Sequence, residues 1–241
     1  MKKAKKSLSQ NFIHDKNICN KIVNLTQIKN KNIIEIGPGY GFLTDFIIAK
    51  KPKNLYLIEK DNKLYNFLIK KYSNNNNINI INEDVLNFDF KKLENVIIIS
   101  NLPYNISTKI ITKLFKFSSN INKMIMMIQK EVAYKFDYNI EKLNKYKFLN
   151  FLTSIYIRHF NVSPTAFKPK PKVQSTVVTF IFKKNILDWD KIEEFTSIVF
   201  KNKRKKISNK LFINLNKINN VAEKRIDEIK IQDLLRIYNF F

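Results

Sequence analysis

The chain has 241 residues with 44% hydrophobic and 13% aromatic side chains, which excludes an intrinsically disordered protein. Its formal net charge of +24, from 44 Lys and Arg against 20 Asp and Glu, favours a polyanionic partner, nucleic acid before membrane. One Cys and two His exclude an internal disulfide and disfavour a metal site, and no apolar run is long enough to span a bilayer.

From residue 31 onward, short apolar runs alternate with segments of helical periodicity. Residues 32–37 (NIIEIG) predict a buried strand, and the apolar spacing from Phe42 to Ile47 predicts a helix after it. By the same criteria we expect helices at 64–72 and 107–117 and strands at 54–59, 78–82, 96–100, 123–129 and 177–182. Nearly continuous apolar strands alternating with helices are typical of a parallel sheet covered on both faces, so the sequence predicts an α/β fold.

The last part of the chain, 188–241, has helical periodicity, with Trp189, Ile192 and Phe195 on one face. We place a domain boundary near residue 184, between a main domain (1–184) and a small helical domain (185–241). The basic N-terminus lacks the apolar stretch of a secretory signal, so we expect a cytoplasmic protein.

All 3 glycines of the chain (Gly37, Gly39 and Gly41) lie in one turn, GPGYG, directly after the first strand. Glycine at such a position lets the backbone approach a ligand closely. The dinucleotide fingerprint G-x-G-x-x-G would need a glycine where this chain has Phe42. The turn therefore favours a nucleoside ligand without a pyrophosphate, such as S-adenosylmethionine, over NAD, although a purely structural turn explains it about as well.

Polar residues follow the next strands, at the edge of the sheet where ligands of α/β folds bind. Glu59 stands where a carboxylate commonly accepts hydrogen bonds from ribose hydroxyls, the alternative being a solvated acidic residue. In Asn-Leu-Pro-Tyr (101–104), the Asn101 amide oxygen could accept a hydrogen from an exocyclic amine, and Tyr104 could stack on a flipped base. The alternative is an ordinary Asn-Pro turn with a core tyrosine.

Together these motifs resemble the rRNA adenine N6,N6-dimethyltransferases, in the branch that modifies two adjacent adenosines near the 3′ end of small-subunit (16S) rRNA. The segments that carry the resemblance are KKSLSQNFIHD (5–15), EIGPGYGFLT (35–44), IEKD (58–61), NED (82–84), NLPYNIST (101–108), QKEVA (129–133) and SPTAFKPKPKVQSTVV (163–178). The resemblance implies a Rossmann-like S-adenosylmethionine-dependent methyltransferase with a small C-terminal helical domain. It also implies a monomer that needs no metal, binds small-subunit rRNA and acts in small-subunit biogenesis.

The resemblance also implies a role for individual residues. In the cofactor site, Asn11 and Ile13 would lie over S-adenosylmethionine, and Gly37 would approach its methionine part. Glu59 would contact the ribose. Asp84, and not the neighbouring Glu83, would contact the adenine. For the target adenine, Asn101 would touch both cofactor and base, Tyr104 would stack on one face and Phe167 on the other, and Phe12 could line the pocket. The prolines of 163–173 predict a stiff, extended loop that holds Phe167, which could otherwise be a simple core anchor.

The densest positive run, 201–206, opens the C-terminal segment and resembles the basic segment of the family. We expect Lys203, Arg204, Lys205 and Lys206 to contact rRNA phosphates. A solvated helix face is the alternative, because an AT-rich coding sequence would also enrich lysine. The N-terminal KKAKK (2–6) is a second candidate for RNA contact, and we assign His14, His159 and Cys19 to structure or surface.

Two other functions fit parts of the pattern. The sister branch methylates large-subunit (23S) rRNA and confers macrolide resistance; Ser9 favours it, whereas QKEVA and the PTAF-x-P-x-P-K-V run favour the small-subunit branch. A non-catalytic RNA-binding assembly factor is the third candidate. The intact glycine turn and Asn-Leu-Pro-Tyr favour catalysis, since a pure binder has no chemical need for them.

Overall fold

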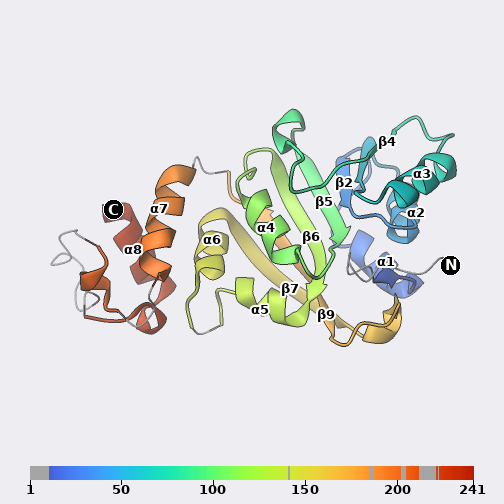
Figure 1. Ribbon diagram of the computed structural model, residues 1–241. Coiled ribbons are helices and arrows are strands. Elements are labelled where there is room, and N and C mark those ends of the chain that lie inside the picture. The colour runs from blue at the N-terminus through green and yellow to red at the C-terminus, as the bar shows by residue number, and fades with distance from the viewer. Residues whose placement is uncertain (1–10, 141, 185–186, 202–204, 212–220, 222) are drawn as a thin grey trace.

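A seven-stranded sheet forms the centre of the computed structural model, which describes residues 11–241 except 141, 185–186, 202–204, 212–220 and 222 (Figure 1). The strand order is β4-β3-β2-β5-β6-β9-β7. The bounds are β2 Asn32–Ile36, β3 Asn54–Ile58, β4 Ile78–Ile81, β5 Val96–Asn101, β6 Ile121–Gln129, β7 Ser154–Val162 and β9 Ser175–Phe182. The strands from β4 to β6 are parallel, β9 runs antiparallel to β6, and β7 runs antiparallel to β9. The predicted α/β fold is confirmed, with β7 as an additional edge strand.

Helices cover both faces of this sheet, because successive isoleucines of its strands point to opposite sides. In β5, Ile97 packs in one buried cluster with residues of three helices, α1 (Lys16–Val23), α2 (Phe42–Ala49) and α3 (Asn62–Lys71). The next residue, Ile98, packs in a second cluster with α4 (Ser107–Phe115), α5 (Lys130–Phe136) and α6 (Lys145–Thr153). The apolar runs that predicted the strands thus form two cores, one on each face.

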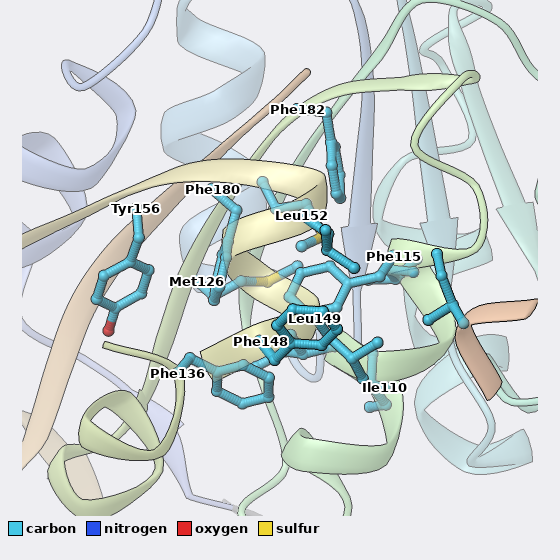
Figure 2. Close-up of a cluster of buried hydrophobic side chains, with 14 of the residues drawn as sticks. Ile110, Phe115, Met126, Phe136, Phe148, Leu149, Leu152, Tyr156, Phe180 and Phe182 are labelled. Atoms are coloured by element: carbon cyan, nitrogen blue, oxygen red, sulfur yellow. The ribbon is translucent and has the colours of Figure 1, made fainter. Parts of the chain in front are cut away.

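A group of phenylalanine side chains packs in the second core (Figure 2). The Phe115 ring lies edge-on to Phe136, Phe180 and Phe182, with centroid distances of 5.8, 5.6 and 6.0 Å. Burying one such side chain contributes about 1.5–3 kcal/mol, and an edge-on pair adds about 0.5–1.5 kcal/mol. This packing fixes α4 and α5 against the sheet; α4 follows the loop after β5 at the carboxyl edge of the sheet, and α5 begins there directly after β6.

The C-terminal segment contains two α-helices, α7 (Trp189–Phe200) and α8 (Ile231–Phe240). Between them the described residues form 3₁₀ turns at Ile207–Asn209 and Ile226–Glu228, so the prediction of helix throughout 188–241 is wrong there. A physical reason is found in the sequence, because like charges four residues apart, such as Lys201 and Lys205, would repel each other in a continued α7.

The C-terminal helices pack against the sheet domain through α6. Phe195 of α7 lies 5.5 Å from Phe148 of α6, and Tyr238 of α8 lies 5.9 Å from the same ring, between ring centroids. The change from sheet to helices falls between β9 and α7, around the predicted boundary near 184. One buried cluster runs through both parts, so the division into domains 1–184 and 185–241 stays a prediction. No helix within the described ranges has the length and apolar character needed to cross a membrane.

Candidate active site at the carboxyl edge of the sheet

A cavity of about 430 Å³ opens at the carboxyl edge of the sheet. The strands β2 and β5 are neighbours there, and the chain leaves β2 toward β3 and β4 but leaves β5 toward β6. The loops after β2 and β5 therefore diverge and leave a crevice at this switch point. The six predicted cofactor residues all line the cavity: Asn11, Ile13, Gly37, Glu59, Asp84 and Asn101. The structure thus brings them together, while their individual contacts with a cofactor stay predictions.

The glycine turn holds positive φ angles, 65° at Gly37, 62° at Gly39 and 75° at Gly41. A Cβ on Gly39 would lie 2.8 Å from the ring of Phe12, and one on Gly41 would lie 2.3 Å from Tyr72 Oη. A Cβ on Gly37 would meet no atom within 4 Å. Protein contacts therefore require the second and third glycines, and only at Gly37 is there open space next to the backbone for a ligand.

Gly41→Ala is expected to destabilise the fold by about 2–5 kcal/mol. An alanine in the left-handed conformation costs about 1–2 kcal/mol, and the clash of its Cβ with Tyr72 costs about 1–3 kcal/mol. Tyr72 Oη cannot retreat cheaply, because two acceptors hold its single hydroxyl hydrogen in place, Asp45 Oδ1 at 2.7 Å and Gly41 O at 3.0 Å. Gly37→Ala is the control, since it shares the positive φ without the contact and should lose only about 1–2 kcal/mol. Urea unfolding of both variants measures the difference, and equal losses would contradict it.

Glu59 links the end of β3 to the glycine turn. It is 6% exposed, and its carboxylate accepts hydrogen bonds from Gly39 N at 3.2 Å and Asp61 N at 2.9 Å. Burial raises the pKa of Glu59, although these backbone hydrogen bonds oppose the rise. The low exposure excludes the alternative of a solvated acidic residue. Each carboxylate oxygen can accept more than one hydrogen bond, so the side chain can still serve a ribose.

Asp84 lies after β4, where its carboxylate accepts from Lys60 Nζ at 2.6 Å and from Leu86 N at 2.9 Å. Burial by itself would raise the pKa of Asp84, but these two hydrogen bonds, together with the charges of Lys60 and Lys113, outweigh it and lower the pKa below its usual value. Lys113 of α4 holds the following loop through three backbone carbonyls, those of Val85, Leu86 and Phe88, at 3.0, 2.8 and 2.7 Å. Lys113 is not among the residues predicted from the sequence.

Asn101, the last residue of β5, has a side-chain amide in which the two polar atoms differ in their hydrogen bonding. Its Nδ2 donates to the backbone oxygen of Asn11 at 2.9 Å. Its Oδ1 is buried and has no hydrogen-bond partner in the described part of the chain. Since a backbone carbonyl can only accept, Asn11 selects the NH₂ end of the amide and leaves Oδ1 as an acceptor without a donor. An unpaired buried acceptor costs about 1–3 kcal/mol, so this atom indicates a donor that arrives with a ligand.

The N-terminal segment joins the parts of the site. The short strand β1 (Phe12–Ile13) pairs antiparallel with β8 (Phe167–Lys168), while the neighbouring Asn11 holds Asn101. The ring of Phe12 also packs edge-on against Tyr40 of the glycine turn, at 4.9 Å between centroids. One short segment therefore contacts the glycine turn, the Asn101 amide and the strand of Phe167.

The two aromatic rings predicted to hold the target base are close but not parallel. Their centroids are 6.5 Å apart and their planes meet at 74°, so a base could lie parallel to only one of them in this arrangement. Tyr104 Oη forms a 2.5 Å hydrogen bond with Ser175 Oγ. Phe167 is 2% exposed and packs in the first core, which is the geometry of a core anchor. Its role against a target base stays a prediction.

The loop before Phe167 differs from the expected extended form. Residues Pro164–Ala166 form a 3₁₀ turn, because Pro164 stands at its first position and Ser163 Oγ accepts from Thr165 N at 3.3 Å. The prediction of an extended loop over 163–173 is therefore wrong for these three residues.

Among the described residues, the remaining candidates other than His14 do not line this cavity. Lys205 and Lys206 are exposed, and Lys206 Nζ pairs with Glu223 at 2.6 Å; Lys203, Arg204 and the segment 2–6 lie outside the described residues. His159 donates to or accepts from Thr179 at 2.8 Å, and burial raises the pKa of the Cys19 thiol to about 12. His14, assigned to structure or surface, in fact lines the cavity. No cluster of His, Cys, Asp and Glu within the described ranges could hold a metal ion.

A largely parallel sheet with a glycine turn, the carboxylates of Glu59 and Asp84, and Asn101-Leu102-Pro103 around one crevice is typical of Rossmann-like methyltransferases. The family model described as "Ribosomal RNA adenine dimethylase" matches residues 1–241, and the chain belongs to this family. The resemblance found in the sequence motifs is thereby confirmed.

Two relatives are named ribosomal RNA small subunit methyltransferase A. The one from Mesomycoplasma hyopneumoniae (strain 232) is 42% identical over 244 residues, covering 98% of this chain and 87% of that protein. The one from Hydrogenobaculum sp. (strain Y04AAS1) is 36% identical over 247 residues, covering 99% and 94%.

Two solved structures share the fold. A dimethyladenosine transferase from Plasmodium falciparum matches with a TM-score of 0.78 at 22% identity, covering 95% of this chain and 100% of that one. The 23S rRNA methyltransferase ErmE matches with a TM-score of 0.76 at 21% identity, covering 95% and 98%.

Proposed function

We propose that this protein transfers methyl groups from S-adenosylmethionine to the N6 amines of two adjacent adenosines near the 3′ end of small-subunit rRNA. The observation that carries the proposal is the buried Oδ1 of Asn101 at the end of β5, an acceptor to which none of the described residues donates. The family and the small-subunit methyltransferases among its relatives supply the substrate class.

The residues around the cavity fit this cofactor. Gly37 leaves open space beside its backbone, and Glu59 presents buried acceptor oxygens that suit ribose hydroxyls. Asp84 lies next on the cavity wall, where its carboxylate suits an adenine amino group. When bound, S-adenosylmethionine supplies an electrophilic methyl group on a sulfonium.

The chain's own residues position the amine. Asn101 Oδ1 accepts one N6 hydrogen, a neighbouring backbone carbonyl accepts the other, and the nitrogen lone pair is then free to react. Asn11 keeps the amide in the required orientation through its carbonyl. Tyr104, fixed by Ser175, offers a ring on which the extruded adenine stacks. The proton leaves to solvent once the amine is methylated, so the reaction needs no strong general base.

Methylation of purified small and large ribosomal subunits, with modified adenosines mapped by reverse-transcription stops, tests the proposal. We expect modification near the 3′ end of small-subunit rRNA. Modification confined to large-subunit rRNA would establish the macrolide-resistance alternative instead. A protein that binds RNA without binding labelled S-adenosylmethionine would be the non-catalytic assembly factor, for which an unpaired Asn101 acceptor has no use.

The basic run after α7 belongs to the same proposal as a contact for rRNA phosphates, and so does the expectation of a cytoplasmic monomer in small-subunit biogenesis. Lys205→Ala with Lys206→Ala is expected to weaken rRNA binding and to reduce the slope of log K against log salt by about 0.7–0.9 for each phosphate that the protein no longer neutralises. Titrations of RNA binding at several salt concentrations measure this slope.

The control for this prediction is Lys29→Ala with Lys31→Ala. Both residues are exposed and precede β2, at the edge of the sheet opposite the cavity. The control therefore lowers the net charge by the same amount as the first double variant, but at a place away from the cavity. An equal change of slope in both double variants would show that the run 201–206 is only a solvated surface.

A further inference from the structure

An exposed tyrosine on α5 lies between two cations. Tyr134 is 39% exposed, the guanidinium carbon of Arg158 lies 4.9 Å from its ring centroid, and Lys130 Nζ lies 6.0 Å from it. We call Lys130, Tyr134 and Arg158 the Tyr134 cluster. No part of the proposed methyl transfer uses these residues, and α5 itself is already anchored by its buried face, Val132, Ala133 and Phe136.

The Tyr134 cluster is preorganised by its neighbours. Asp137, which is buried, pairs with Arg158 at 3.4 Å between Nη1 and Oδ2, and so holds the guanidinium beside the tyrosine ring. Lys130 is fixed at the other end of α5, where its backbone N donates to Gln174 O at 3.0 Å. The exposed ring therefore needs little ordering on binding a ligand.

The Tyr134 cluster is connected to the predicted target-base site through a few direct contacts. Tyr104 Oη bonds Ser175 Oγ at 2.5 Å, and Ser175 stands opposite Gln129, the last residue of β6. The helix α5 begins at the next residue, Lys130, and Tyr134 follows about one turn later. In Figure 1, α5 lies by the ends of β6 and β9, on the side of the sheet toward α6 and the C-terminal helices.

The chemistry of the Tyr134 cluster fits a nucleotide. Unpaired bases stack on aromatic rings and on arginine planes, and lysine or arginine beside the ring can neutralise the adjoining phosphate. An rRNA strand whose target adenosine lies at Tyr104 must continue across the protein surface in both directions. One direction leads over Lys130 to Tyr134, and from there toward α6 and the C-terminal segment that carries the basic run.

We propose that the Tyr134 cluster is a second nucleotide subsite, in which a base of the rRNA strand flanking the target adenosine stacks on Tyr134 or Arg158. The subsite rests on the proposed function, since that function places rRNA at Tyr104. It would set the affinity and register of the strand without taking part in methyl transfer.

The test compares Tyr134→Ala with Tyr134→Phe in methylation of purified small subunits. Loss of one stacked base predicts that Tyr134→Ala raises the KM for subunits about 5- to 150-fold, the equivalent of about 1–3 kcal/mol. The kcat at saturating subunits and the Kd for S-adenosylmethionine should not change, because Tyr134 lies outside the cavity. Tyr134→Phe keeps the ring and should retain a KM near that of the wild type.

A matched control is Ile157→Ala on β7, since Ile157 is also 39% exposed but belongs to the opposite face of its strand from Arg158. It should leave the KM unchanged. An unchanged KM in Tyr134→Ala, or equal losses in Tyr134→Ala and Tyr134→Phe, would overturn the subsite.

A second measurement separates the subsite from the proposed function. Binding of a short single-stranded RNA oligonucleotide, followed by fluorescence anisotropy without cofactor, should weaken in Tyr134→Ala but not in Tyr134→Phe or Ile157→Ala. If the wild type fails to methylate small subunits, the proposed function fails, whereas equal oligonucleotide affinity in all variants overturns the subsite alone.

Discussion

Replacement of Asn101 by alanine is expected to lower the rate of methyl transfer by at least about 100-fold, the usual cost of removing one preorganised hydrogen-bonding group. The amide oxygen is the acceptor proposed for an N6 hydrogen, and water cannot replace it easily at a buried position. The fold should remain intact, because the variant also removes an unpaired buried oxygen, which offsets the missing hydrogen bond to Asn11. Single-turnover methylation of small subunits measures the rate, and thermal unfolding checks the stability.

Asn105→Ala is the matched control, because Asn105 stands in the loop that follows Asn101 and also lines the cavity, but is exposed. It should keep most of the activity. Wild-type single-turnover rates in Asn101→Ala would remove this residue from the mechanism. Loss of RNA binding in parallel with activity would instead assign Asn101 to substrate affinity.

The strands of the parallel sheet could be predicted because each is a short run rich in aliphatic residues, and most of them are followed by a helix with its own apolar stripe. The edge strand β7 could not, since α6 ends at Thr153 and β7 begins at Ser154, with no turn residue between them. The alternation of buried and exposed residues in β7 was also hard to recognise, because Ile155 and Ile157 are exposed at the sheet edge, whereas isoleucine in a sequence suggests a buried position.

The cofactor side of the site could be predicted because parallel topology brings the ends of separate strands to one edge, whatever the details of packing. Contacts between distant residues could not. The hydroxyl of Tyr72 reaches Gly41, and the carbonyl of Asn11 reaches Asn101, 90 residues away in the chain. Neither contact has a local sequence pattern. The first explains why position 41 is a glycine, and the second orients the candidate catalytic amide of Asn101.

Glu35 gives the largest expected effect on stability. It lies in β2, is 2% exposed, and accepts a hydrogen bond from Thr44 Oγ1 at 2.6 Å. Burial, reinforced by the carboxylates of Asp45 and Glu59, raises the pKa of Glu35 from 4.5 to about 8, although the bond from Thr44 and the charge of Lys71 oppose the rise. The folded protein therefore keeps a proton on Glu35 at neutral pH, which the unfolded chain has already released.

The sign of the pH dependence follows from this difference. Below the unfolded pKa both states hold the proton, and as the pH rises toward 8 only the unfolded state loses it, so the unfolding free energy falls. Each pH unit in this window costs about 1.4 kcal/mol, which gives a loss of about 5 kcal/mol by pH 8. Glu35→Gln keeps an oxygen for Thr44 and has no proton to lose, so it should be the more stable protein at pH 8.

Urea unfolding of wild type and Glu35→Gln at several pH values between 5 and 8 measures this effect as a difference that widens with pH. The difference isolates Glu35, because all other ionisable groups are the same in both proteins. Glu94→Gln is the control, since it removes an exposed carboxylate and should leave the pH dependence of the wild type unchanged. Parallel stability curves for wild type and Glu35→Gln would mean that Glu35 ionises in the folded protein at the same pH as in the unfolded chain, and that water or a cation reaches it through the cavity it lines.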